Sequence, residues 1–324
     1  MRTLVCGVGD FGALHAALVR AHEATELVGV VDVDAARAEQ VAAGEVAAHT
    51  DLGRALDNLE PDAVIVATPE QAHREDAEAA LAAGAHVLIE KPVAMSVDDV
   101  DTIEAAAARA DRVVLPGHVS RFLPEVADVL ADPRPPRHLA ASRYVPAARR
   151  GPHGRVHPAW MAMVHDLDLI AALLPDRCRV SVAAAERTTP TGGPSPDVCA
   201  ALLSVEGHAT ATVDTVWLLP HERQYIDASL RVAYDDEIVD VAVPGDGLRR
   251  VRADGEHRPS AAIDGRVGAR PVGALASQLG HLADLRAGRA APLVTLRDAR
   301  RAGILADAVV HAAATHQLAD VDLS

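Results

Sequence analysis

Apolar residues gather in short runs through the first third of the chain, and amphipathic stretches separate these runs. Strand-like runs fall at residues 3–6, 27–31, 63–67, 86–89 and 112–115. Helical patterns fall at residues 11–24, 34–43, 70–83 and 96–109. An alternation of strand and helix predicts a doubly wound parallel sheet, and the unbroken apolar run at 63–67 indicates a strand buried on both faces.

The pattern changes near Ser120, where longer strands with less helix between them begin. Strands are predicted at residues 179–186, 198–206, 208–218 and 226–243. Turn signals such as Glu206-Gly207 separate them, which predicts a large, open, mostly antiparallel sheet. Helices are predicted at 160–174 and 296–316, and a loop at 188–196.

A glycine-rich motif, Gly7-Val8-Gly9-Asp10-Phe11-Gly12, follows the first strand and opens the first helix. In this context Gly7 permits a tight turn, Gly9 lets a pyrophosphate approach the backbone, and Gly12 lets helix and strand pack closely. The helix N-terminus offers free N–H groups to phosphate oxygens. The motif therefore predicts a dinucleotide site, with a plain glycine-rich turn as the alternative interpretation.

Asp32 ends the second strand at the spacing that this fingerprint expects. Its carboxylate can accept hydrogen bonds from ribose hydroxyls and would repel a 2′-phosphate, which favours NAD over NADP. Arg37 is close enough in sequence to keep NADP open. Thr68-Pro69 and Glu90-Lys91 follow later strands at the carboxyl edge, where ligands bind in such folds, although Thr68-Pro69 is equally compatible with an ordinary turn.

Composition narrows the possible partners. The 324 residues are 49% hydrophobic but only 2% aromatic, so the cores must be built from Ala, Val and Leu. A formal net charge of −15 disfavours nucleic acid and anionic membranes as partners. The three cysteines show no metal-ligand spacing, which predicts no metal site and no disulfide framework. With neither a leader nor a membrane-length apolar stretch in view, a cytoplasmic protein is expected.

Several motifs, taken together, resemble the Gfo/Idh/MocA oxidoreductase family over most of the chain. They are Gly7-x-Gly9-x-x-Gly12, Thr68-Pro69-x-x-x-His73, the run from Ala80 to Pro92, Gly117-His118 with Arg121, Phe122 and Pro124, and His165-Asp166-Leu167-Asp168-Leu169. The resemblance implies a Rossmann domain at 1–119 and an α/β domain at 120–324 for substrate binding and oligomer contacts. The C-terminal helix is expected to pack on one of the two domains.

The resemblance also implies hydride transfer between NAD(P) and a carbinol or carbonyl carbon of a sugar, sugar nucleotide or cyclitol. It implies a homodimer or homotetramer as well. The residues expected to bind the cofactor are Gly7, Gly9, Asp10, Phe11, Gly12, Asp32, Thr68, Pro69, His73, Glu90 and Lys91. The residues expected to bind substrate are Lys91, Arg121, Arg149, Arg150, Arg155, His157, His165 and Asp168.

Two residues are the expected catalytic groups. By the resemblance, Lys91 contacts the reacting hydroxyl, where an ammonium stabilises a developing alkoxide, and a surface ion pair with Glu90 is the alternative. His165 would be the general acid and base because imidazole titrates near neutral pH. Asp168, three residues on, is a neighbour of His165 on the predicted helix.

The sequence departs from the family pattern one helical turn before His165. The family commonly has an Asp there, and this chain has Met161, whose thioether cannot orient an imidazole as a carboxylate does. Three interpretations stay open. Asp166 or Asp168 substitutes for the missing acid, His165 acts alone on a different substrate, or the chain has lost redox chemistry.

A basic run lies just upstream of that helix and contains Arg149, Arg150, Arg155 and His157. In an acidic protein it indicates a pocket for an anionic group such as a phosphate or carboxylate, with a solvated loop as the alternative. Two further functions stay open beside the sugar or cyclitol dehydrogenase. One is a non-catalytic NAD(P)-binding regulator, and the other is a reductase of an imine, an enone or another non-sugar carbonyl.

Overall fold

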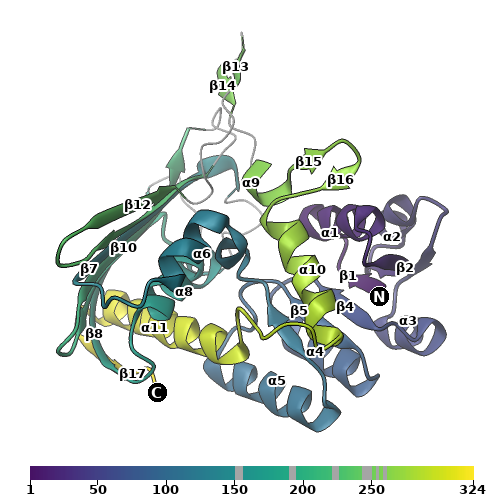
Figure 1. Ribbon diagram of the computed structural model, residues 1–324, viewed down its shortest axis with the longest axis horizontal. Coiled ribbons are helices and arrows are strands. Elements are labelled where there is room, and N and C mark those ends of the chain that lie inside the picture. The colour runs from purple at the N-terminus through teal and green to yellow at the C-terminus, as the bar shows by residue number, and fades with distance from the viewer. Residues whose placement is uncertain (150–155, 190–194, 221–225, 243–249, 253–254, 258–260) are drawn as a thin grey trace. The chain divides into compact units, whose positions relative to one another are not determined.

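The computed structural model describes residues 1–149, 156–189, 195–220, 226–242, 250–252, 255–257 and 261–324. The chain divides into two compact units (Figure 1). Unit 1 comprises Met1–Val119 and Asp264–Arg300, and unit 2 comprises Ser120–Ile263 and Arg301–Ser324. Each unit is built around its own sheet.

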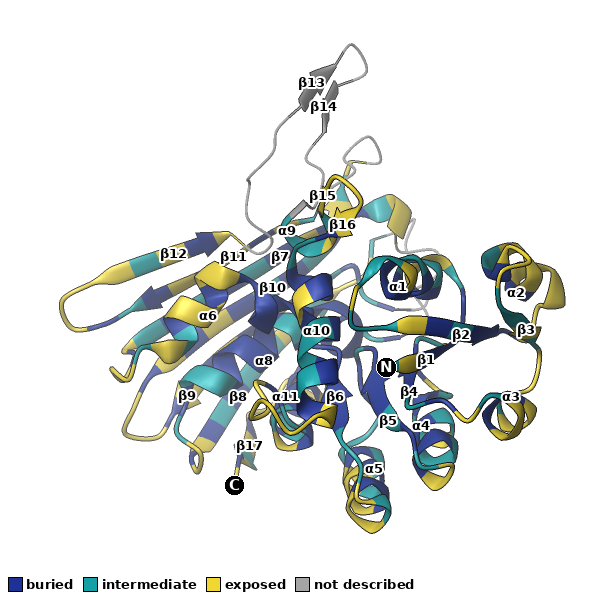
Figure 2. Ribbon diagram, turned by 45° about the vertical axis from the view of Figure 1, so that its right-hand side comes forward, coloured by how far each residue is buried: buried dark blue, intermediate teal, exposed yellow. Residues whose placement is uncertain are grey.

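Unit 1 holds a six-stranded parallel sheet in the order β3-β2-β1-β4-β5-β6. Its strands are β1 (Arg2–Cys6), β2 (Glu26–Val31), β3 (Ala47–His49), β4 (Ala63–Val66), β5 (His86–Ile89) and β6 (Val114–Pro116). Every residue of β4 is buried, as its unbroken apolar run predicts (Figure 2). The predicted doubly wound parallel sheet is confirmed.

The helices of unit 1 are α1 (Asp10–Ala21), α2 (Ala35–Ala42), α3 (Leu52–Leu59), α4 (His73–Ala82), α5 (Val97–Ala110) and α10 (Ala274–Arg286). Three of them begin at side-chain caps, because Asp34, Asp51 and Ser96 each accept a hydrogen bond from a first-turn amide. α4 starts three residues later than predicted, since a turn from Pro69 to Ala72 comes first. A short hairpin of β15 (Arg266–Val267) and β16 (Arg270–Pro271) completes the unit.

Unit 2 holds a seven-stranded sheet in the order β12-β11-β7-β10-β9-β8-β17. Its strands are β7 (His138–Pro146), β8 (Arg179–Arg187), β9 (Val198–Val205), β10 (Thr210–Leu219), β11 (Asp227–Ala233), β12 (Ile238–Ala242) and β17 (Ala319–Asp322). β7 and β10 run parallel and the other neighbours antiparallel, so the predicted mostly antiparallel sheet is confirmed. A separate hairpin pairs β13 (Arg250–Arg252) with β14 (Gly255–His257).

Helices cover one face of this sheet (Figure 1). Those that contact its strands are the 3₁₀ turn η2 (Ala147–Arg149), α6 (Pro124–Ala131), the π-helix η3 (Ala159–Met163) and α8 (Val164–Leu173). The other helical elements are the 3₁₀ turn η1 (Val119–Phe122) and α11 (Leu296–Thr315). A one-turn helix, α9 (Ala261–Asp264), lies at the junction of the two units in the sequence. Along β9 and β11 alternate residues are buried, as expected for a sheet with one covered face. No described helix is long and apolar enough to cross a membrane.

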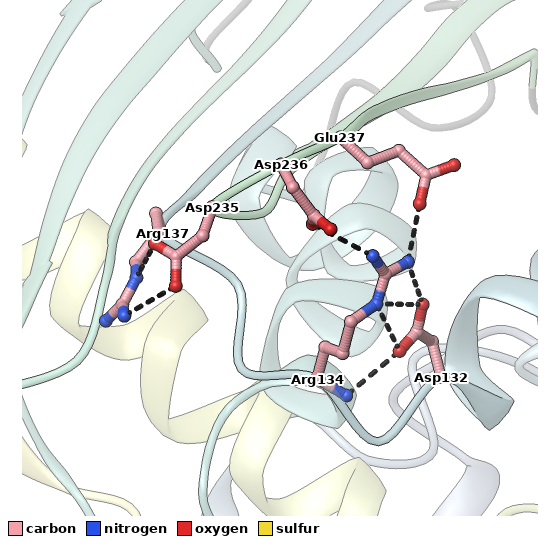
Figure 3. A network of polar contacts seen from close by, with 6 residues as sticks. All are labelled: Asp132, Arg134, Arg137, Asp235, Asp236 and Glu237. Carbon is pink, nitrogen blue, oxygen red and sulfur yellow. Dashed lines mark hydrogen bonds and ion pairs between the residues drawn. The ribbon is translucent and has the colours of Figure 1, made fainter.

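The single strand predicted at 226–243 is wrong, because the segment is a hairpin of β11 and β12. The turn closes with a 2.8 Å hydrogen bond from the Tyr234 amide to the Glu237 carbonyl. Figure 3 shows the exposed ion pairs around this turn: Arg134 contacts Asp236 and Glu237, and Arg137 pairs with Asp235. These arginines lie before β7, so the turn is held by charges far away in sequence.

Candidate functional site

The glycine motif of unit 1 has the backbone geometry that its sequence predicts. Gly7 has φ +80°, and a Cβ there would lie 2.5 Å from the Thr68 amide nitrogen. A Cβ at Gly12 would lie 1.8 Å from the Gly7 carbonyl oxygen. A Cβ at Gly9 would meet nothing within 4 Å. Gly7 and Gly12 are thus required by packing, whereas Gly9 faces open space that a phosphate could enter.

The N-terminus of α1 fits a pyrophosphate. Gly9 is its cap residue and supplies no side-chain acceptor to the first-turn amides. Those amides and the positive end of the helix dipole therefore suit an anion. Asp10 and Phe11 are both exposed at this end of the helix.

Asp32 connects the glycine loop to the end of β2. Its Oδ2 accepts a 2.9 Å hydrogen bond from the Val8 amide, and its Oδ1 accepts one of 3.0 Å from the Asp34 amide. Nη1 of Arg37 lies 3.2 Å from Oδ1. Nη1 of Arg37 also lies 3.4 Å from Oδ2, so four contacts fill the roughly four acceptor positions of the carboxylate. Because Arg37 is half-exposed, ribose hydroxyls could take its place on Asp32. Arg37 also contacts Asp34 at 3.5 Å, and its positive charge is balanced by two acids.

The loop after β5 carries Glu90 and Lys91. Glu90 is buried, and its Oε1 lies 2.8 Å from Nε2 of His15 on α1, while its Oε2 accepts a 3.2 Å hydrogen bond from the Lys91 amide. Burial alone would raise the pKa of Glu90, but the hydrogen bond from His15 and the charges of His15 and Lys91 hold that pKa below its usual range. Glu90 is therefore a buried partner of His15.

His73 lies on the other side of this loop. Its Nδ1 is 2.7 Å from the Pro92 carbonyl oxygen, and its Nε2 is 2.9 Å from the Thr68 carbonyl oxygen. The side chain is buried. Both ring nitrogens thus contact the protein backbone, and the Thr68–Pro69 turn and the Lys91–Pro92 loop are joined through one imidazole.

Lys91 is the only lysine in the chain, beside thirty arginines. Every other basic side chain of the Lys/Arg type is therefore a guanidinium. A guanidinium does not lose its proton in proteins, whereas a lysine amine can. Lys91 is thus the one Lys or Arg side chain of the chain that could release a proton.

In unit 2, His165 is the second residue of α8, the helix that directly follows the π-helix η3. A π-helix bonds residue i to i+5, so the i to i+4 relation between Met161 and His165 assumed from the sequence is altered here. Met161 lies inside η3 and is buried.

The two acids that follow His165 are both engaged with buried arginines. Asp166 accepts two hydrogen bonds of 2.8 Å from Arg143 on β7. Asp168 accepts bonds of 2.8 and 2.6 Å from Arg121 on η1. Arg121, expected to bind substrate, thus directs Nε and Nη2 to Asp168. Arg143 was missed from the sequence because β7 itself was not predicted.

The remaining predicted substrate residues lie before η3. His157 accepts a 3.1 Å hydrogen bond from the Ala159 amide at Nδ1, so its Nε2 is the donor to Glu186 at 2.8 Å. His157 therefore holds the start of the π-helix. Arg149 is exposed at the end of η2, while Arg150 and Arg155 lie outside the described residues. Among the described residues no cluster of metal ligands occurs.

Comparisons with known proteins agree with this geometry. Residues 1–118 match the family described as "Oxidoreductase family, NAD-binding Rossmann fold", GFO_IDH_MocA. A UDP-N-acetylglucosamine 3-dehydrogenase of Acidithiobacillus ferrooxidans is 36% identical over 175 residues, 53% of this chain and 54% of that protein. Inositol 2-dehydrogenase 3 of Saccharopolyspora erythraea is 37% identical over 125 residues, 38% of this chain and 37% of that protein.

A third relative is the 4-carboxy-2-hydroxymuconate-6-semialdehyde dehydrogenase of a Sphingobium species, 37% identical over 126 residues, 38% of this chain and 40% of that protein. The aligned stretches thus span about half the length of these curated relatives, or less. A solved structure of the Acidithiobacillus ferrooxidans dehydrogenase covers 97% of both chains, with 26% identity and a TM-score of 0.80. Residues 1–118 therefore match the NAD-binding domain of the Gfo/Idh/MocA oxidoreductases, and the whole chain is similar in fold to a dehydrogenase named above.

Proposed function

We propose that the protein is an NAD(P)-dependent oxidoreductase that transfers a hydride between the nicotinamide and a carbinol or carbonyl carbon. The observation that carries this proposal is the single lysine at the carboxyl edge of a Rossmann sheet, in the same unit as the glycine loop and Asp32. NAD is the proposed cofactor because Asp32 would repel the 2′-phosphate of NADP. The NAD-binding family of residues 1–118 supports this choice.

The chain's own residues would bind the cofactor and move the proton. Gly9 and the first turn of α1 hold the pyrophosphate, and Asp32 accepts from the adenosine ribose. When bound, the nicotinamide takes the hydride from the carbinol carbon or returns it to the carbonyl carbon. In the oxidative direction the hydroxyl proton passes to a base, for which Lys91 and His165 are the proposed groups.

The substrate class follows from the relatives. They include a sugar-nucleotide dehydrogenase and an inositol dehydrogenase, so a sugar, a sugar nucleotide or a cyclitol is proposed here. The basic run supports an anionic group on the substrate. Arg149 is exposed, which leaves its side chain accessible to an anionic group on a substrate. The test replaces Arg149 together with Arg150 and Arg155. If alanine at all three positions leaves KM unchanged, the anionic substrate is wrong.

The test of function starts with titrations of the protein with NAD⁺, NADH, NADP⁺ and NADPH. Turnover is then followed at the reduced-nicotinamide absorbance with UDP-N-acetylglucosamine, myo-inositol and other sugars and cyclitols. Lys91→Met should abolish turnover while NADH still binds. Lys91→Arg is the matched control, because it keeps the charge but cannot release a proton. Equal turnover in Lys91→Arg and wild type would contradict proton transfer by Lys91.

A second candidate is a reductase of an imine or another non-sugar carbonyl, favoured by Met161 where the family commonly has an acid. The semialdehyde dehydrogenase among the relatives shows that sequences this similar act outside the sugars. A keto-sugar, imine and enone panel with NADH separates the two candidates. Tight NADH binding without turnover on any panel would instead support a regulator.

We also propose a homo-oligomer formed through the sheet of unit 2. Helices cover one face, and the opposite face exposes apolar side chains, among them Leu202, Leu218 and Tyr144. These apolar side chains lie among exposed polar residues such as Thr212 and Ser204, and a second copy of the chain would cover them. Light scattering should give a dimer or tetramer for the wild type and a smaller species for Leu202→Asp.

The buried, free cysteines support a cytoplasmic location, which we also propose.

A further inference from the structure

Two buried histidines flank the loop that carries the only lysine. His15 lies on α1, the helix whose N-terminus is proposed to hold the pyrophosphate, and His73 is the first residue of α4. Both side chains are almost fully buried, at 1% and 2% exposure. Neither histidine is therefore placed to exchange protons with solvent, and each directs its hydrogen bonding to the residues around Lys91.

On one side the connection runs through Glu90. Nε2 of His15 contacts Oε1 of Glu90 at 2.8 Å, and Oε2 of Glu90 accepts from the Lys91 amide. Phe11 packs edge-on against the His15 ring, with 5.3 Å between ring centroids. His15 is thus held in place by the aromatic ring and in turn holds the carboxylate that fixes the Lys91 backbone.

On the other side the connection runs through Pro92. Nδ1 of His73 contacts the Pro92 carbonyl at 2.7 Å, and Nε2 contacts the Thr68 carbonyl at 2.9 Å. A carbonyl oxygen can only accept, so each contacting nitrogen is a donor. The residue after Lys91 is therefore tied to the neighbouring loop of the sheet.

A third side is closed by the backbone after β6. The Gly117 amide donates a 2.6 Å hydrogen bond to the Ile89 carbonyl. A Cβ at Gly117 would lie 2.8 Å from the Cα of Glu90 and 3.0 Å from the Lys91 nitrogen. The backbone at Gly117 therefore closes this side of the loop, and the two histidine contacts hold the other two sides.

We propose that His15 and His73 are positioning residues for Lys91, His15 through Glu90 and His73 through Pro92. The proposal rests on the proposed function of Lys91. A lysine side chain has four rotatable methylene bonds, so its amine can be placed reproducibly only when its backbone is fixed. A displacement of about 1 Å at a reacting group can cost about 100-fold in rate.

Gln and Asn substitutions should have opposite effects at the two histidine positions. The side-chain amide nitrogen of Gln occupies roughly the place of Nε2, and that of Asn roughly the place of Nδ1. At position 15 the contact uses Nε2, so His15→Gln keeps it and His15→Asn loses it. At position 73 the contact to Pro92 uses Nδ1, so His73→Asn keeps it and His73→Gln loses it.

The readout is the nuclear magnetic resonance signal of Lys91 after reductive methylation with ¹³C-formaldehyde. Because the chain has one lysine, this gives one side-chain signal beside that of the Met1 amine. We expect His15→Asn and His73→Gln to shift or broaden that signal and to lower kcat about 10- to 100-fold. His15→Gln and His73→Asn should stay close to the wild type in both.

The control is His86→Gln, at the start of the same strand and away from the loop. It should leave the Lys91 signal and kcat unchanged. If His15→Asn and His73→Gln fold and keep the wild-type signal, or if all four variants lose it alike, the positioning role is wrong. If the signals follow the expected pattern while Lys91→Met does not affect turnover, the positioning role holds and the proposed function is wrong.

Discussion

Arg143 donates hydrogen bonds of 2.8 Å to each carboxylate oxygen of Asp166, although neither side chain is more than 5% exposed. This pair joins β7 to the first turn of α8, next to His165. Removing one partner leaves a buried charge without compensation, so Arg143→Met should lower the free energy of unfolding by about 3–5 kcal/mol. Urea denaturation measures this loss.

The double variant Arg143→Met, Asp166→Leu is the matched control for that experiment. It removes both charges and should recover most of the lost stability. If the double variant is as unstable as Arg143→Met, the uncompensated charge is not the cause of the lost stability. The hydrogen bonds and packing of the pair would then stabilise the fold.

Glycine substitutions in the motif should separate folding from cofactor binding. Gly9→Ala adds a methyl group where nothing lies within 4 Å, so its melting temperature should equal that of the wild type. Its Kd for NADH should rise about tenfold or more, because the methyl group takes the space proposed for the phosphates. Gly12→Ala would overlap the Gly7 carbonyl and should destabilise the protein by about 3 kcal/mol or more. A destabilised Gly9→Ala with unchanged NADH affinity would contradict this assignment.

Replacing Asp32 should change the cofactor preference. Asp32→Ala removes the charge that repels a 2′-phosphate and releases Arg37 from its 3.2 Å contact. The ratio of the NADPH and NADH dissociation constants should fall about tenfold or more. The variant Asp32→Ala, Arg37→Ala separates the two causes, since it keeps only the loss of repulsion. If Asp32→Ala leaves the ratio unchanged, Asp32 does not contact the adenosine ribose.

The Glu90 carboxylate should stabilise the fold in a pH-dependent way. Its folded pKa lies below the ordinary value of 4.5, so the stabilisation is complete above about pH 4.5 and is lost as the pH falls through the folded pKa. The difference in unfolding free energy between wild type and Glu90→Gln should therefore be largest near neutral pH and shrink in acid. A difference that grows in acid would mean that the pKa of Glu90 is raised in the folded protein and not lowered.

The three cysteines should be unreactive in the folded protein. Burial raises the pKa of Cys6 far above its ordinary range and raises the pKa of Cys199 to about 12, and burial also raises that of Cys178. The thiolate is the reactive form, so a disulfide reagent at pH 8 should find three thiols only after denaturation. One equivalent reacting within seconds in the native state would contradict this.

Periodicity alone predicts the strands and helices whose ends are marked by local chemistry. The helix starting at Ser96 has its serine cap, and strands β1, β2 and β5 fall where apolar runs predict them. β3 was missed because it has three residues, none fully buried. The β11–β12 turn was missed because its stabilising arginines precede β7.

Some residues of the candidate site have a local signal in the sequence, and others do not. The glycine motif and Asp32 directly follow strands, and Lys91 lies two residues after β5, so the sequence alone predicts all three as candidates. The partnership of His15 with Glu90, 75 residues apart, depends on packing between α1 and the β5 loop and has no local signal. The partners of Asp166 and Asp168 are equally remote, at 23 and 47 residues, so the neutralisation of these acids could not be predicted.

The discontinuity of unit 1 has a consequence for synthesis on the ribosome. Residues 1–119 emerge first, but Asp264–Arg300 belong to the same unit. Gln278 of α10 donates a 3.2 Å hydrogen bond to the Pro116 carbonyl, and Arg286 pairs with Asp62 at 2.6 Å. At ordinary translation rates the first segment waits on the order of ten seconds for these contacts. The nascent Rossmann sheet therefore has to wait through that interval with the flank contacted by α10 still uncovered.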